Sequence, residues 1–281
     1  MMNALQSFSK LFGRSNGVIL GMVHVQALPG TPRHCMPMPS IIKKACQEAA
    51  GYQSAGVDGI MLENMHDIPY LHSHAMGPEV TAAMTAIASQ VRRICPTIPC
   101  GMQVLTAQKE ALAVAMATGL DFIRAEGFVF SHIGDEGLIN SCAGELLRYQ
   151  RNIGAENIKI FTDIKKKHSS HAITADVSIE ETAEAAEFFG SDGVIVTGTA
   201  TGQPAKVEDL QDVQGAVNIP VLIGSGVNTD NVDRYLGASA LIVGSHFKHG
   251  GQWLNDVDFG KVDDFMTKVN TFRQSGNSVS R

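Results

Sequence analysis

Ionisable side chains stand at the ends of several short apolar runs in this sequence. His24 closes the run that begins at Val18, and Glu63 closes the run that begins at Gly59. Carboxylates, imidazoles and amines that meet in one cavity can exchange protons with a substrate, and a buried lysine can form a Schiff base with a carbonyl group. The candidate catalytic residues are the ionisable residues in such positions: His24, Glu63, Arg124, Glu126, Asp163, Lys165, Lys167 and His168.

Two glycine-rich turns follow the last two apolar runs. The first is Gly224-Ser225-Gly226 and the second is Gly244-Ser245. Glycine lets backbone N–H groups approach an anion closely, and a helix expected after the first turn would add a favourable partial charge. A pair of such turns is typical of the phosphate site of a (β/α)8 barrel, although two ordinary tight turns could have the same sequence. The candidate ligand-binding residues are these and other polar positions near strand ends: Asn64, Gln103, Thr197, Gly198, Gly224, Ser225, Gly226, Gly244 and Ser245.

Structural explanations compete with these chemical ones. Arg124 and Glu126 could form a structural ion pair inside a barrel, and His24 could be a core histidine. Lys166 is expected to point to solvent, and the segment 197–202 could be a turn without a ligand. The positions that could do chemistry therefore depend on which side chains face a common cavity.

A divalent metal is a further candidate ligand of the same cavity. His24, Glu63, Asp163 and His168 are suitable ligand types. No short-range ligand spacing supports a metal site, and the sequence establishes no cofactor. A divalent metal therefore stays an option rather than an expectation.

A repeated pattern organises the segments that must position these residues. Four segments begin with a glycine that leads into an apolar run, at Gly56, Gly119, Gly190 and Gly237. Each follows an amphipathic stretch, so each glycine is expected to end a helix and lead into a strand. Four other apolar runs alternate with them, which predicts strands near 18–25, 59–64, 100–105, 122–127, 158–164, 193–198, 221–225 and 240–245. Helices are predicted near 40–55, 79–95, 108–118, 143–154, 178–190, 206–217, 229–236 and 261–272.

Eight strand–helix units in 281 residues favour one closed (β/α)8 TIM-type barrel of the aldolase kind. Runs that are apolar on both faces are typical of a buried parallel sheet. An open dinucleotide-binding sheet would need G-x-G-x-x-G after its first strand, and HVQALPGTP lacks it. The barrel is expected to span 18–272, after an N-terminal extension or short presequence at 1–17 and before a flexible tail at 273–281.

Three long loops follow predicted strands, at 26–39, 128–142 and 166–175. They are expected on the carboxyl-end face, where barrel active sites form. Long loops on one face suggest a lid over a bound ligand.

Composition limits the function classes. The formal net charge is −6 and the longest basic cluster is the three lysines at 165–167, which argues against nucleic-acid binding. The five cysteines include no CxxC pair, which argues against a disulfide framework and a structural zinc site. No apolar run approaches the roughly 20 residues that span a bilayer. We expect a soluble intracellular protein that could form a homo-oligomer.

The N-terminus leaves two compartments open. It has no acidic residue before Gly17 and carries Lys10 and Arg14 beside apolar side chains. Such a segment could be a very short organelle presequence, or a helix that closes the bottom of the barrel. The cytoplasm and the mitochondrial matrix are therefore both candidate locations.

Several stretches together resemble the BtpA family, also called the BtpA/SgcQ family. They are GMVHVQALPGTP, DGIMLEN, FIRAEGFV, FTDIKKKH, VTGTATG and LIGSGVNTDNV, and the similarity runs from about Val18 to Phe272. The resemblance implies an aldolase-type barrel. It brings no established reaction, although the family takes its name from a cyanobacterial protein needed for accumulation of photosystem I. Members in organisms without a photosystem imply a different general role.

These observations favour an enzyme of uncharacterised reaction on a small phosphorylated metabolite, of the lyase, isomerase or hydrolase type. Asp163 or Glu63 would be the base, and Lys167 would be the electrophile or the Schiff-base residue. Whether Lys165 or Lys167 faces the barrel stays open. The alternative is a non-catalytic assembly or stability factor, as in the photosystem I role that named the family.

Overall fold

A computed structural model describes residues 2–277 and places them in one closed parallel barrel. The strands pair in the order β1-β11-β10-β9-β7-β4-β3-β2, and β1 pairs with both β11 and β2. All eight predicted strands are confirmed, with ends that differ by at most two residues. They are β1 (Val18–His24), β2 (Gly59–Glu63), β3 (Cys100–Gln103), β4 (Phe122–Ala125), β7 (Lys159–Ile164), β9 (Gly193–Val196), β10 (Val221–Ile223) and β11 (Ala240–Val243).

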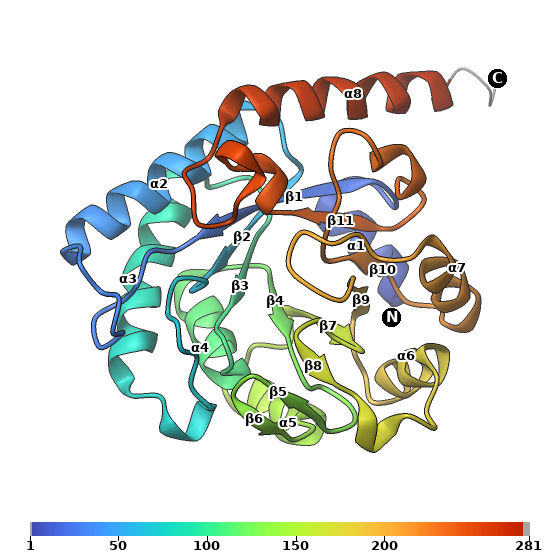
Figure 1. Cartoon of the computed structure of the whole chain (residues 1–281), viewed down its shortest axis with the longest axis horizontal. Coiled ribbons are helices and arrows are strands. Elements are labelled where there is room, and N and C mark those ends of the chain that lie inside the picture. The colour runs from blue at the N-terminus through green and yellow to red at the C-terminus, as the bar shows by residue number, and fades with distance from the viewer. Residues whose placement is uncertain (1, 278–281) are drawn as a thin grey trace.

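Helices surround the strand ring (Figure 1). They follow the predicted positions with one exception, and the last extends to residue 277 instead of 272. Their bounds are α2 (Met38–Ser54), α3 (Pro78–Ile94), α4 (Gln108–Thr118), α5 (Ala143–Asn152), α6 (Ile179–Phe188), α7 (Val207–Ala216) and α8 (Phe259–Asn277). Within the described residues, none of the helices has the length and apolar character needed to cross a bilayer.

The exception is the segment between β10 and β11, where the predicted helix at 229–236 is wrong. The Asn228 side chain accepts hydrogen bonds from the backbone N–H groups of Asp230 at 2.8 Å and Asn231 at 3.1 Å. A single 3-10 turn, η3 (Val232–Arg234), follows. Asn side chains compete with helical hydrogen bonds in this way. The turn after β10 therefore has no α-helix whose dipole could attract an anion.

Apolar side chains pack on both faces of the strand ring. Alternate residues of β1 show this, because Ile19 and Val23 pack outward against the helices while Leu20 and Met22 pack in the barrel interior. Successive side chains of a strand point to opposite faces. The inner cluster fills the lower part of the barrel and leaves the carboxyl-end face to polar groups.

A short helix, α1 (Ala4–Phe12), precedes the barrel and closes its bottom. Asn3 caps this helix in a reciprocal pair of hydrogen bonds with Gln6. Phe8 is 2% exposed, and Phe12 lies edge-on to Phe122 at 5.7 Å between ring centroids. Figure 1 shows α1 behind the strands, at the end opposite the long loops. Residues 4–12 therefore contribute to the barrel core.

The C-terminal end of α8 also contacts the barrel. Arg273 forms an ion pair with Asp58 and donates a hydrogen bond to the carbonyl oxygen of Gly17 at 2.7 Å. The prediction of a flexible tail from residue 273 is therefore wrong for residues 273–277, because these residues continue the helix. Residues 278–281 lie outside the described residues.

Two of the predicted long loops form a small antiparallel sheet instead. Its strands are β5 (His132–Gly134), β6 (Gly137–Ile139) and β8 (Ser169–Ser170), in the order β6-β5-β8. Ile133 pairs with Ser170, so the loop after β4 is joined to the loop after β7. The β5–β6 turn carries Asp135 and Glu136 to the barrel mouth.

Candidate functional site

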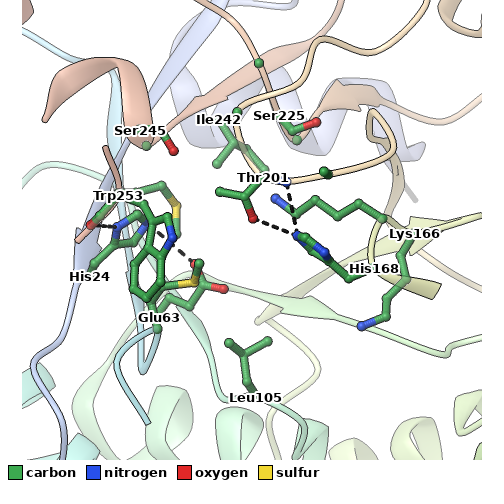
Figure 2. Close-up of a pocket in the computed structure, with 18 of the residues that line it drawn as sticks. His24, Glu63, Leu105, Lys166, His168, Thr201, Ser225, Ile242, Ser245 and Trp253 are labelled. Carbon is green, nitrogen blue, oxygen red and sulfur yellow. Dashed lines mark hydrogen bonds and ion pairs between the residues drawn. The ribbon is translucent and has the colours of Figure 1, made fainter. Parts of the chain in front are cut away.

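A cavity of about 540 Å³ opens at the carboxyl ends of the barrel strands (Figure 2). A volume of this size is typical of sites that enclose small ligands. Most of the predicted residues line it: His24, Glu63, Arg124, Glu126, Lys167, His168, Gly224, Ser225, Gly226, Gly244 and Ser245. The barrel therefore brings residues from distant parts of the sequence to one place.

Lys167 has an unusual position among the cationic residues of this cavity. Its backbone N–H donates to Thr197 Oγ1 at 3.0 Å, which fixes the start of the side chain. Its side-chain amine has no hydrogen bond or ion pair to any residue of the described chain. Burial, together with the nearby Arg124 guanidinium, lowers the pKa of Lys167. A larger share of this amine is therefore neutral and nucleophilic than in an exposed lysine.

The two lysines that precede Lys167 lie opposite to their predicted positions relative to the cavity. Lys165 leaves the cavity, and its amine donates to the carbonyl oxygen of Thr174 at 2.9 Å. Lys166 was expected to point to solvent, but it lines the cavity with a side chain that is 9% exposed. The reason is a left-handed backbone at Lys165, with φ of 44°, which breaks the alternation of the strand after Ile164.

Arg124 pairs with Asp163 of the neighbouring strand β7, and not with Glu126. Its Nε lies 2.9 Å and its Nη2 2.8 Å from the two carboxylate oxygens. Both Asp163 oxygens thus accept hydrogen bonds, and its side chain is fully buried. Asp163 is therefore unsuited to act as a general base, and it holds Arg124 in place.

Glu126 belongs to a second buried pair. Lys166 Nζ lies 2.9 Å from its Oε2, and Gln103 Nε2 donates to its Oε1 at 3.1 Å. Burial disfavours the Lys166 cation, but the Glu126 carboxylate more than offsets this, so the pKa of Lys166 is raised. Lys166 thus stays protonated, which distinguishes it from Lys167.

His24 and Glu63 form the third polar group of the site. His24 Nε2 and Glu63 Oε2 are 3.9 Å apart, and His24 Nδ1 lies 3.4 Å from the carbonyl oxygen of Trp253. A carbonyl oxygen can only accept, so Nδ1 carries the proton and Nε2 keeps a free lone pair. Burial lowers the pKa of His24 and raises the pKa of Glu63, while the Lys167 and Arg124 charges oppose the shift of Glu63. Burial thus favours the uncharged forms of both the imidazole and the carboxyl group, which face each other.

The glycine turns have a packing role as well as exposed backbone. A Cβ on Gly226, whose φ is 72°, would lie 2.1 Å from the backbone nitrogen of Pro204. A Cβ on Gly244 would lie 3.2 Å from the His24 ring. The position of Gly226 therefore requires glycine for the close approach of the Pro204 backbone, whereas Gly244 packs tightly against the His24 side chain. This packing is the structural explanation that the sequence left open.

Backbone N–H groups in these turns have no partner inside the protein. Among the described residues, no hydrogen bond engages the amides of Ser225, Gly226 and Val227 after β10, or those of Ser245 and His246 after β11. The Ser225 hydroxyl is occupied, because it accepts from the Gly198 amide at 2.7 Å and donates to the Gln203 carbonyl at 2.9 Å. An anion at this end would be held by backbone amides.

The remaining predicted ligand-binding residues lie outside the cavity and form hydrogen bonds with neighbouring residues. The Asn64 side chain accepts from the Leu105 amide at 2.7 Å and donates to Asp67 at 3.0 Å. Gln103 orients Glu126, and Thr197 accepts from the Lys167 amide. These residues, with Gly198, position cavity residues and do not line the cavity themselves.

The four candidate metal ligands do not converge. Asp163 is engaged by Arg124, while the His168 ring interacts with Thr201 Oγ1 at 2.9 Å. Within residues 2–277, no three His, Cys, Asp or Glu side chains are arranged to hold a metal ion. His24 and Glu63 are the only two of the set that approach one another.

Sequence reasoning missed several cavity residues on long loops. Besides Lys166, they include Met65, Ile68, Tyr70, Leu105, Asp135, Glu136, Thr201, Asn228, His246 and Trp253. Trp253 is the single tryptophan of the chain, and its position after the last strand was an available signal. The others lie beyond strand ends, where alternation no longer predicts direction.

Comparisons with known proteins agree with this architecture. The BtpA family model matches residues 15–271. "Uncharacterized protein F13E9.13, mitochondrial" of Caenorhabditis elegans is 51% identical over 95% of this chain and 98% of its own length. "Photosystem I biogenesis protein BtpA" of Synechocystis is 33% identical over 90% of this chain and 88% of its own length.

A solved structure supports the fold alone. Thiamine phosphate pyrophosphorylase from Pyrococcus furiosus superposes with a TM-score of 0.58 at 15% identity, over 94% of this chain and 98% of that one. Its identity is too low to carry residues across. The family model and the relatives cover nearly the whole barrel, and on that basis the chain belongs to the BtpA family.

Proposed function

We propose that this protein is an enzyme that acts on a small phosphorylated carbonyl compound through a Schiff base on Lys167. The observation that carries the proposal is the Lys167 amine, which lies in the cavity without a hydrogen bond or ion pair among the described residues and has a lowered pKa. Lysines that form Schiff bases are activated in this way, by burial and by a neighbouring cation.

The surrounding groups suit the proton transfers of such a reaction. The neutral Lys167 amine would attack the carbonyl carbon to form a carbinolamine. Glu63, whose pKa is raised by burial, would give its proton to the leaving hydroxyl group, so that water departs and a protonated imine remains. The imine can accept the electron pair of an adjacent carbon–carbon or carbon–hydrogen bond, as an aldol-type cleavage or an isomerisation requires. His24 Nε2, with its free lone pair, is available to take up the proton released in that step.

The phosphate would bind at the turns after β10 and β11. The unpartnered amides after β10 and β11 can donate to phosphate oxygens, as in other phosphate-binding loops. The structurally similar pyrophosphorylase of P. furiosus takes its name from thiamine phosphate, which is a parallel but identifies no residue here. Phosphate would hold the substrate while its carbonyl carbon reaches Lys167.

Reductive trapping tests the proposal. The protein is incubated with glyceraldehyde 3-phosphate, dihydroxyacetone phosphate or ribose 5-phosphate and cyanoborohydride, and the adduct is located by peptide mass spectrometry. We expect labelling at Lys167 that the variant Lys167→Ala abolishes. Lys165→Ala is the matched control and should label like the wild type, because the Lys165 amine is held outside the cavity by Thr174.

Labelling that spreads over surface lysines and persists in Lys167→Ala would contradict the proposal. The second candidate, a non-catalytic assembly or stability factor, would then be favoured. The name of the Synechocystis relative and the exposed apolar side chains of Ile133 and Leu138 on the small sheet support it. That function would need a partner that Lys167→Ala recovers as well as the wild type does.

The word mitochondrial in the name of the C. elegans relative supports the mitochondrial matrix over the cytoplasm as the location of this protein.

A further inference from the structure

One wall of the cavity is apolar. Met65, Ile68 and Tyr70 follow β2, and Leu105 follows β3. Trp253 joins them from the loop after β11. Figure 2 shows Trp253 beside His24 and Glu63, on the side of the cavity opposite Lys166 and His168. The proposed Schiff-base reaction does not use this wall.

The Trp253 ring is fixed in position by its loop. Lys248, which is 1% exposed, forms a buried ion pair with Glu48 of α2 at 3.0 Å, and this pair holds one end of the loop. The carbonyl oxygen of Trp253 accepts from His24 Nδ1, and the indole ring lies 5.2 Å from the His66 ring. The wall is therefore built before any ligand arrives.

The indole ring of Trp253 has an exposed part and an N–H group that a ligand could contact. Its side chain is half-buried, and its N–H donates no hydrogen bond to any residue in the described part of the chain. Tryptophan combines a large apolar face, on which another ring can pack offset-stacked or edge-to-face, with one polar N–H, so a flat ring with a polar edge suits it as a ligand. The hydroxyl groups of an open-chain sugar would lose hydrogen bonds with water against Met65, Ile68 and Leu105.

The size of the cavity agrees with a ring. A phosphorylated compound of three or four carbons would leave much of 540 Å³ to water, whereas small-molecule sites usually bury most of the ligand surface. We propose that the substrate is a phosphate ester whose carbon skeleton carries a planar ring, and that this ring lies against Trp253. This inference rests on the proposed function, because it places the phosphate at the turns after β10 and β11.

Three phosphate esters separate the two proposals. Glycerol 3-phosphate carries no ring, phenyl phosphate carries a small one, and adenosine 5′-monophosphate carries a nucleobase. Binding is measured by calorimetry, with inorganic phosphate as a further arm. The emission of Trp253 reports contact directly, since it is the single tryptophan of the chain. We expect the two ring compounds to bind more tightly than glycerol 3-phosphate and to change this emission.

Variants of Trp253 complete the test. We expect Trp253→Ala to weaken binding of the ring compounds about tenfold and to leave glycerol 3-phosphate unchanged. Trp253→Phe, which keeps a ring, should restore most of the affinity. If all three esters bind with equal affinity and Trp253→Ala does not change that affinity, the claim that the substrate carries a ring is wrong. The proposal that the protein binds phosphate esters would be unaffected. If none of the three esters and no inorganic phosphate binds, the proposed function fails and the ring inference fails with it.

Discussion

Glu63 and Lys167 have pKa shifts of opposite direction in the same cavity. Burial raises the pKa of Glu63 and lowers that of Lys167, and each charge partly opposes the shift of the other. Pairs of groups whose environments move their pKa values toward neutrality are typical of acid–base sites. The uncharged forms of both groups, an amine and a carboxylic acid, are the ones that Schiff-base formation needs.

The pH dependence of trapping follows from these two shifts. The neutral amine becomes more abundant as pH rises through the pKa of Lys167, and the acid form of Glu63 disappears as pH rises through its own pKa. The trapping rate of the wild type should therefore be bell-shaped against pH. Glu63→Gln should lower the rate by about 100-fold or more and leave a single rise with pH, which is measured by timed cyanoborohydride quenching.

The control for this prediction is Glu126→Gln. Glu126 also lines the cavity, but Lys166 at 2.9 Å and Gln103 at 3.1 Å occupy its two carboxylate oxygens, so it is not available to a substrate. The bell should persist in this variant. A bell that persists unchanged in Glu63→Gln would show that Glu63 is not the acid.

The direction of each side chain could be predicted only as far as the strands run. His24, Glu63 and Arg124 lie at or before strand ends, which is why they were predicted as candidates, and all three line the cavity. Lys165 and Lys166 follow the end of β7, where the positive φ of Lys165 reverses the order. A left-handed non-glycine residue is set by the surrounding loops, so the sequence pattern could not predict it.

At the level of elements, α1 covers the bottom of the barrel and contributes side chains to its inner core. Phe8 and Phe12 belong to the inner cluster with Leu20, Phe122 and Phe161. An amphipathic helix of nine residues is marginal alone, so its stability must come from this packing. The sequence left both this helix and a presequence open, because apolar residues beside Lys10 and Arg14 suit either one.

Phe8→Ala should therefore destabilise the whole barrel. Removal of a buried phenylalanine ring costs about 3 kcal/mol or more, which should appear as a lower melting temperature in differential scanning calorimetry. Leu5→Ala is the matched control, because Leu5 is on the same helix and is 43% exposed, so its effect should stay within about 0.5 kcal/mol. Equal melting temperatures for Phe8→Ala and the wild type would show that α1 is not part of the cooperative core.

The elements that prediction missed lie on the carboxyl-end face. The helix expected at 229–236 is replaced by Asn-centred turns, and β5, β6 and β8 form inside predicted loops. Their conformations depend on contacts between loops, such as the pairing of Ile133 with Ser170. Local sequence patterns carry little information on such contacts.

For the whole molecule, the four glycine-to-strand segments and the four apolar runs that alternate with them were sufficient to predict the closed barrel. Each of these eight strands is buried on both faces, and eight strand–helix units in sequence leave few other topologies. The same topology brings His24, Glu63 and Lys167 together from three separate strands or strand ends. The chemistry is harder to predict than the fold, because it depends on which lysine amine has no ion-pair partner. The pairs Arg124–Asp163 and Lys166–Glu126 leave the Lys167 amine unpaired, and these pairs can be recognised only in the structure.

The central claim is that Lys167 forms a covalent bond with a substrate whose phosphate lies at the turns after β10 and β11. The most direct measurement is a crystal structure of the wild type soaked with the trapping compounds and reduced in the crystal. We predict continuous electron density from Lys167 Nζ to a substrate carbon, with phosphate oxygens within hydrogen-bond distance of backbone amides at 225–227 or 245–246. An unmodified Lys167, with the phosphate compound bound outside the cavity or joined to another lysine, would contradict the claim.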